Sequence, residues 1–253
     1  MLPEVGDGIE AGTHAGARTL ERLIDFDRIN SGETRLGLGA VNVRTGNYVY
    51  FDNKEQTIGV EHVMASGALP PGFPAIEIDG QFYWDGGLVS NTPLFHVLED
   101  HPRRNTLVFQ VDLWSARGDV PRDLPGVLER QKDIIYSSRT RFNTDAIQQE
   151  QVLRTNLINL LDKLPPELRD SAEATALRQA MHPAYINVVH LIYRRKHYEI
   201  DSKDYEFSHA TMRSHWQSGR NDTAATLKHP DWLELPPGGC GMVTHDLHRE
   251  KSA

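Results

Sequence analysis

Hydrophobic positions along the chain follow two periods, one typical of strands and one typical of helices. Short runs rich in β-branched and aromatic residues predict strands at residues 36–43, 48–51, 75–78, 81–84, 106–113 and 186–193. Apolar residues at helical spacing predict helices at residues 18–29, 60–69, 93–98, 127–164, 167–181 and 207–219, and the tail from Pro236 is expected to be a loop. Strands separated by helices favour an α/β layered fold over an all-helical one.

Turn residues support this division. Thr45-Gly46-Asn47 and Asp79-Gly80 each separate two strand runs, which predicts two hairpins. Thr92 is suited to cap a helix and Pro93 to be its first residue. The nearly continuous apolar run 106–113 is typical of a parallel strand that is buried on both faces.

Composition narrows the classes of protein. The chain has 253 residues, of which 39% are hydrophobic and 25% charged, which is ordinary for a globular protein. The net charge of −8 argues against nucleic acid as the main partner. The single cysteine, Cys240, excludes an intrachain disulfide, and no apolar run is long enough to cross a bilayer. A cytoplasmic protein is therefore expected, with peripheral contact with membranes left open.

One carboxylate has a setting suited to chemistry. Asp85 ends the aromatic strand run Gln81–Trp84, and Gly86 and Gly87 follow it directly. Glycines without side chains let another backbone or a substrate approach closely. An acid held in this way can deprotonate a hydroxyl nucleophile. The alternative is a simple turn, which Asp and Gly form at little cost.

Other candidate chemistry is weaker. His245 and His248 could bind a metal, but no third ligand is evident and the tail is expected to be loose. Arg139 and Arg141 could meet an anionic head group, although a solvated helix face is the simpler interpretation. Cys240 has no histidine beside it. Gly6-Asp7-Gly8 begins a dinucleotide-type pattern that no strand precedes, so no cofactor or metal is predicted.

The segments His62–Leu69 and Asp85–Leu94 resemble the second half of a patatin-like phospholipase domain, which ends in an Asp-Gly-Gly motif and an Asn/Pro-bearing helix start. Residues 130–141 and 202–207 resemble the C-terminal extension of a bacterial patatin-like subfamily. The resemblance implies a layered α/β/α sheet, incomplete on its N-terminal side, with a mainly helical extension. The expected domains are a lead-in at 1–16, the C-terminal part of the catalytic domain at 17–114, and an extension of unknown role at 115–253.

The resemblance also implies chemistry: a Ser–Asp dyad that hydrolyses acyl esters of lipids, with Asp85 as base and Gly86-Gly87 as the turn that positions it. However, the sequence contains no G-x-S-x-G, and neither Ser31 nor Ser66 lies in such a motif. We therefore expect an N-terminally truncated hydrolase that is inactive alone and acts on a lipid or acyl ester only when the missing part is supplied. The alternative is a degenerate, non-catalytic binding or scaffold module; the acyl chain, head group and oligomeric state stay open.

Overall fold

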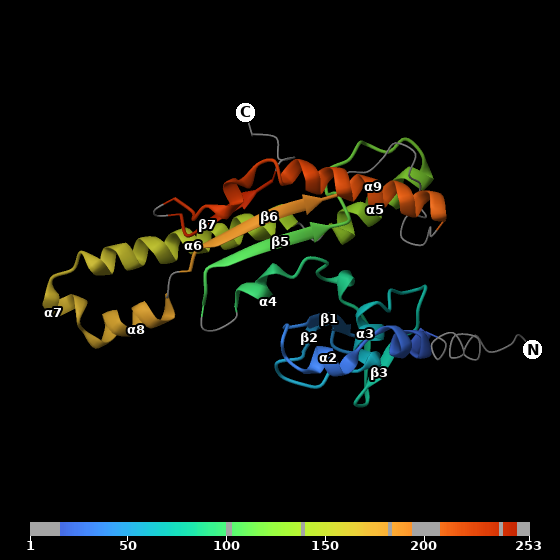
Figure 1. Ribbon diagram of the computed structural model, residues 1–253, viewed down its shortest axis with the longest axis horizontal. Coiled ribbons are helices and arrows are strands. Elements are labelled where there is room, and N and C mark those ends of the chain that lie inside the picture. Colours follow the sequence, from blue (N-terminus) through green and yellow to red (C-terminus); the bar gives the residue numbers. More distant parts are fainter. Residues whose placement is uncertain are drawn as a thin grey trace, which may run out of the picture. The chain divides into compact units, whose positions relative to one another are not determined.

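The computed structural model describes residues 16–99, 103–137, 140–181, 184–193, 208–237 and 240–246 (Figure 1). The chain divides into two compact units, one up to Asn91 and one from Thr92 onward, and each is described by itself. The expected lead-in at 1–16 lies outside the described residues except for Gly16.

The first unit is built on a four-stranded antiparallel sheet. Its strands are β1 (Gly37–Asn42), β2 (Tyr48–Asp52), β3 (Ile76–Ile78) and β4 (Gln81–Asp85), in the order β2-β1-β4-β3. Helices α2 (Phe26–Asn30) and α3 (Val60–Ser66) accompany it, and residues 16–23 are also helical. One helix was expected over 18–29, but the chain breaks at Asp25, whose carboxylate accepts from the Arg28 N–H and caps α2 instead.

Both predicted hairpins are confirmed. Gly46 takes a φ of 71° between β1 and β2, and Asp79 and Gly80 take φ values of 50° and 73° between β3 and β4. Asp and Gly are the residues that enter this left-handed region most readily. The turns fix the register of their strands, and so they place Asp85 opposite Ala40 on the central strand pair.

The core of the first unit lies between the sheet and α3. Its buried members are Ala40, Phe51, Ile58, Ala65 and Ile78. The Phe51 ring lies edge-on to both His62 and Tyr83, with centroids 4.7 Å and 5.2 Å apart. Tyr83 thus contributes to packing, as expected for the aromatic run that leads to Asp85.

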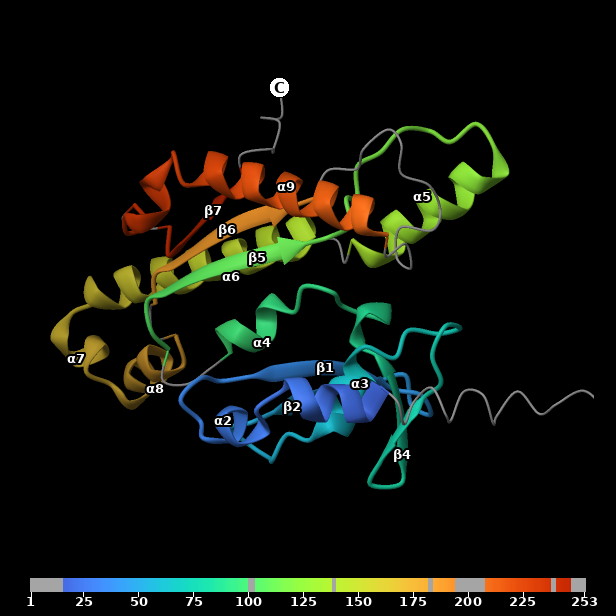
Figure 2. The ribbon, with the colours of Figure 1, turned by 45° about the vertical axis from the view of Figure 1, so that its right-hand side comes forward.

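The second unit contains a three-stranded parallel sheet between helices. Its strands are β5 (Thr106–Asp112), β6 (Ile186–Ile192) and β7 (Met242–His245), in the order β5-β6-β7. Its helices are α4 (Leu94–Leu98), α5 (Leu124–Tyr136), α6 (Thr140–Asp162), α7 (Pro166–Arg169), α8 (Ala172–Ala180) and α9 (His209–Thr226), with a short 3₁₀ turn η2 (Pro230–Leu233). Figures 1 and 2 show α6 and α9 on opposite sides of the sheet, the layered α/β/α arrangement that was predicted.

The two long strands of this sheet differ in burial. All but one residue of β6 are buried, as the parallel arrangement requires. Strand β5 was expected to be buried on both faces, and this was wrong: Val108 packs on the core, but Leu107, Phe109 and Val111 are exposed. These three residues alternate along the strand and so share one face of the sheet, on which the Phe109 ring packs against Trp232, with centroids 5.5 Å apart.

Three further expectations need correction. The single helix expected over 127–164 is two helices, α5 and α6. The tail expected as a loop from Pro236 forms β7, because its backbone completes the free edge of β6. Thr92 does not cap α4, which begins at Leu94; its hydroxyl bonds that of Thr140 instead.

Candidate active site

Asp85 lies at the end of β4, where the strand turns sharply. Its backbone N–H donates to the carbonyl of Ala68 (3.1 Å), which ties the strand end to the segment after α3. Its carboxylate accepts from the backbone N–H of Gly87 at 2.7 Å and so caps the 3₁₀ turn η1 (Gly86–Leu88). Hydrogen bonds therefore hold both the backbone N–H and the side-chain carboxylate of Asp85 at the strand end, as the sequence pattern led us to expect.

The two glycines that follow are buried, and each lies so close to its neighbours that a side chain would not fit. A Cβ on Gly86 would lie 2.7 Å from the carbonyl carbon and oxygen of Gly39 on β1. A Cβ on Gly87 would lie 2.7 Å from the Asn91 side-chain oxygen and 3.1 Å from the Asp85 carboxylate. Side chains at these positions would push the turn away from β1 or displace the carboxylate.

Tyr48 completes the packing behind the turn, and sequence reasoning missed it. Its hydroxyl donates to the carbonyl of Ser90 at 3.2 Å, and it lies so close to Gly39 that a Cβ there would overlap it. Burial, and then the neighbouring Tyr50 and Asp85, raise the pKa of Tyr48, which keeps the hydroxyl neutral. The sequence showed Tyr48 only as the first residue of a strand, so nothing in it indicated this contact across the sheet.

The electrostatic setting of Asp85 combines two opposing effects. Partial burial raises the pKa of the Asp85 carboxyl, and the hydrogen bond from Gly87 lowers it, with burial the larger effect. The carboxyl is a stronger base than a fully hydrated aspartate. That is the direction which improves proton abstraction near neutral pH.

Gly86→Ala is expected to destabilise the first unit by about 1–3 kcal/mol, because the new Cβ meets rigid backbone of Gly39 rather than a movable side chain. Urea unfolding followed by circular dichroism measures this. The matched control is Gly67→Ala in the same unit, whose Cβ would lie 3.8 Å from its nearest neighbour and should change stability by less than about 0.5 kcal/mol. Equal effects of the two variants would contradict the packing argument.

The two serines considered from the sequence do not lie in a nucleophile elbow. Ser31 is exposed, and its hydroxyl donates to the carbonyl of Arg28 at 2.8 Å. Ser66 is the last residue of α3. The hydrogen bond found for the Asp85 carboxylate within the described residues comes from a backbone N–H, that of Gly87.

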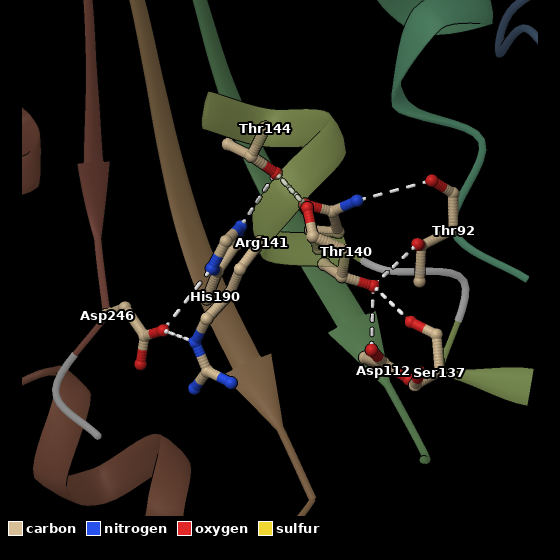
Figure 3. A network of polar contacts seen from close by, with 9 residues as sticks. Thr92, Asp112, Ser137, Thr140, Arg141, Thr144, His190 and Asp246 are labelled. Atoms are coloured by element: carbon tan, nitrogen blue, oxygen red, sulfur yellow. Dashed lines mark hydrogen bonds and ion pairs between the residues drawn. The ribbon is translucent and has the colours of Figure 1, made fainter. Parts of the chain in front are cut away.

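A second group of polar residues lies inside the other unit (Figure 3). The Thr140 hydroxyl donates to the Asp112 carboxylate at 2.7 Å and lies 2.9 Å from that of Thr92. Since the carboxylate is the stronger acceptor, Thr92 supplies the proton in the second contact. Burial raises the pKa of Asp112, and the hydrogen bond from Thr140 opposes this. These contacts attach α6 to the carboxyl end of β5.

Thr144, His190 and Asp246 are aligned like a hydroxyl, an imidazole and a carboxylate of a hydrolase. His190 Nε2 lies 3.1 Å from the Thr144 hydroxyl, and His190 Nδ1 lies 3.5 Å from Asp246 Oδ2. However, Thr144 is fully buried and donates its proton to the carbonyl of Thr140 at 2.7 Å, so His190 is the donor in their contact. A general base must accept that proton, and therefore this trio is structural.

The remaining candidates from the sequence are also placed. Arg141 does not lie on a solvated helix face, because its Nε bonds the buried Asp246 at 2.7 Å. His245 belongs to β7 and bonds Asn187 at 3.2 Å, and burial lowers its pKa. Arg139 and His248 lie outside the described residues. Among the residues that the structure describes, no three His, Cys, Asp or Glu side chains are grouped so as to hold a metal.

Comparison with known families agrees with the resemblance of the Asp85 segment. A family model described as patatin-like phospholipase matches residues 11–98, and a second, described as patatin phospholipase, matches residues 134–238. The chain belongs to the patatin-like phospholipase family. A search of curated proteins found no match.

The two family matches cover parts of both units. The first match includes Asp85 and its turn, and the second covers most of the second unit's elements from the end of α5 to the segment after η2. The family places the chain with lipid acyl hydrolases, and its α/β architecture with a parallel sheet agrees with a patatin-like fold. Within the described residues, no helix is both long and apolar enough to span a membrane. The domain boundaries expected at 16/17 and 114/115 stay a prediction.

Proposed function

We propose that the chain supplies the acid half of a patatin-type lipid acyl hydrolase, with Asp85 as the general base. The observation that carries this is the geometry of Asp85: a partly buried carboxylate whose pKa is raised by burial, fixed at a strand end by the Gly87 N–H. Buried Gly86 and Gly87 leave no side chains between this turn and its neighbours. The family match over residues 11–98 supports the substrate class, an acyl ester of a lipid.

The proposed reaction is acyl transfer through a serine. The Asp85 carboxylate accepts the proton of a serine hydroxyl while the serine oxygen attacks the ester carbonyl carbon. The tetrahedral intermediate expels the alcohol, which takes the proton from Asp85. Water then attacks the acyl carbon with Asp85 as base, the bond to the serine oxygen breaks, the serine oxygen takes the proton back from Asp85, and the carboxylic acid leaves. Atoms and protons balance without a metal or an organic cofactor.

The serine is the missing partner in this proposal. No G-x-S-x-G occurs in residues 1–253, so we propose that these residues alone do not turn over esters and that the nucleophile must be supplied from elsewhere. The competing proposal is a binding module that keeps the turn of Asp85 for packing. The absence of G-x-S-x-G favours this binding module as much as it favours a divided enzyme.

Labelling with a serine-reactive fluorophosphonate tests the proposal. The purified chain should show no labelling above that of heat-denatured protein. Rapid labelling that is lost in a single variant, such as Ser66→Ala or Ser31→Ala, would contradict it, because the chain would then contain its own nucleophile. Joining the chain to a serine-bearing N-terminal segment of a family member distinguishes the two proposals: turnover supports the divided enzyme, and folded but inactive protein supports the module.

A further inference from the structure

The Tyr48 side chain reaches across the sheet of the first unit to the turn that follows Asp85. Strand β1 lies between β2 and β4, so a residue of β2 has to cross β1 to reach the end of β4. Gly39 on β1 makes this possible, because a Cβ there would overlap the Tyr48 hydroxyl. On the far side, a Cβ on Gly86 would lie 3.0 Å from that hydroxyl. The two glycines therefore leave the space that the phenol occupies.

Hydrogen bonds connect the Tyr48 hydroxyl to the Asp85 carboxylate through the turn η1. The hydroxyl donates to the carbonyl of Ser90 at 3.2 Å. The N–H of Ser90 donates to the carbonyl of Gly86 at 2.9 Å, and the N–H of Gly87 donates to the Asp85 carboxylate at 2.7 Å. All of these bonds lie in one short turn, so a shift of its last residue is passed on to the N–H that orients the carboxylate.

The phenol of Tyr48 lies near the Asp85 carboxylate, but its proton goes elsewhere. A phenol has one proton to donate, and that proton goes to the carbonyl of Ser90. Burial, and then the charges of Tyr50 and Asp85, raise the pKa of Tyr48, so the phenol and the carboxylate are within electrostatic reach of each other. A proton donated to the carboxylate would lower the pKa of Asp85, whereas an uncharged ring beside it adds to the burial that raises this pKa. The arrangement therefore favours a basic carboxylate.

We propose that Tyr48 is a positioning residue for Asp85, which acts through the turn η1 and not on the substrate. Its hydrogen bond to Ser90 and its contact with Gly86 fix the turn whose Gly87 N–H orients the carboxylate. The inference rests on the proposed role of Asp85 as general base and adds the residue that holds this base in place. A tyrosine that served only to pack the sheet would change the stability of the first unit and leave the setting of the carboxylate unchanged, and the experiment separates these two roles.

Hydrogen exchange of the full chain, followed residue by residue by NMR, is the first test, and it requires no turnover. Tyr48→Phe keeps the ring and removes the hydroxyl. The amides of Gly87 and Ser90 should then exchange roughly 3- to 10-fold faster, as the loss of one hydrogen bond of ordinary net strength implies. The pKa of Asp85, measured from its carboxyl carbon, should fall toward the ordinary 3.8, because water reaches the loosened turn.

Gly39→Ala is the second variant, because its Cβ displaces the Tyr48 hydroxyl while Tyr48 itself is retained. It should reproduce both effects of Tyr48→Phe. The matched control is Tyr83→Phe, which removes the hydroxyl of a tyrosine two residues before Asp85 whose ring packs on Phe51. This control should leave the exchange of the turn amides and the pKa of Asp85 at their wild-type values. Circular dichroism shows whether each variant has kept its fold.

Ester turnover by the chain joined to a serine-bearing segment of the family is the second test. Tyr48→Phe should lower kcat roughly 10- to 100-fold and leave KM within about twofold, because a misplaced base affects the chemical step and not substrate binding. Equal exchange of the turn amides in Tyr48→Phe and Tyr83→Phe, a pKa of Asp85 that stays or rises, or a raised KM with an unchanged kcat would each overturn the positioning role. A joined protein that is inactive with Tyr48 in place would contradict the proposed hydrolase alone, since exchange and titration test the positioning of the carboxylate without turnover.

Discussion

Asparagine in place of Asp85 is expected to lower ester turnover by about 10²–10⁴-fold, the usual contribution of a general base. The amide keeps the shape of the carboxylate and can still accept from the Gly87 N–H, so the turn is retained. What it loses is the ability to take a proton from serine. The measurement is kcat for a p-nitrophenyl ester, with the chain joined to a serine-bearing segment of the family.

The control for this variant is Asp79→Asn. Asp79 occupies the β3–β4 turn with a φ of 50°, which asparagine also tolerates, so the fold and the rate should be unchanged. If Asp85→Asn kept more than about a tenth of the rate, Asp85 would not be the base, and the packing of its turn would be its main role.

The pH dependence of the two proteins separates catalysis from folding. Burial raises the pKa of Asp85, so turnover should fall as the pH drops through a value above the ordinary 3.8, and Asp85→Asn should lack this limb. The effect of pH on folding stability has the opposite sign, since stability falls as the pH rises. Because the folded state binds the proton more tightly than the unfolded chain, ionisation of Asp85 costs stability as the pH rises. Thermal unfolding should therefore show Asp85→Asn at least as stable as the wild type at pH 7, with the difference vanishing below pH 3.8.

Features set by neighbours in the sequence could be predicted. The Asp79-Gly80 and Gly46 turns need a left-handed backbone that few other residues accept, so the hairpins followed directly. Asp85 followed from the same kind of local evidence, a carboxylate at a strand end before two glycines. In these places one or two residues determine the backbone conformation of the turn, and contacts with distant residues stabilise that same conformation.

Features set by distant contacts could not be predicted. Gly39 lies next to Gly86 only because β1 and β4 pair, and Tyr48 reaches the turn from another strand. The apolar run of β5 indicated burial on both faces, but whether a second layer covers a face depends on distant parts of the chain, and Leu107, Phe109 and Val111 are exposed. For α5, the period of the apolar residues was visible, but the side that faces the protein was not, because the residues that this helix buries are the acids Glu129 and Asp133.

The buried charges of the second unit are the clearest example of such long-range contacts. Arg141 and Asp246 are 105 residues apart in the chain, and the sequence offered only a polar helix and a tail. In the structure, Arg141 Nε meets Asp246 Oδ2 at 2.7 Å, and the Asp246 side chain is 2% exposed. The pair fastens the end of β7 to α6, and His190 Nδ1 on β6 lies 3.5 Å from the same oxygen (Figure 3).

Arg141→Met is therefore expected to destabilise the second unit by about 2–4 kcal/mol, because a buried carboxylate loses its closest cation. Urea unfolding followed by tryptophan fluorescence measures this, since Trp114, Trp216 and Trp232 all lie in this unit. The matched control is Arg178→Met, which breaks an ion pair of similar length, 2.6 Å, to an Asp162 that is 58% exposed. That pair is screened by water, so its loss should cost less than about 0.5 kcal/mol.

The double variant Arg141→Met/Asp246→Leu decides why the single variant is unstable. If the cost comes from leaving a charge without its partner inside the protein, removing the carboxylate as well should recover most of the lost stability. If it comes from the lost packing of the arginine stem, the double variant should be no more stable than Arg141→Met. Recovery would also show that β7 is held to the sheet by its backbone pairing with β6 and not by the ion pair, which would leave the pair with the narrower task of fixing where the strand ends.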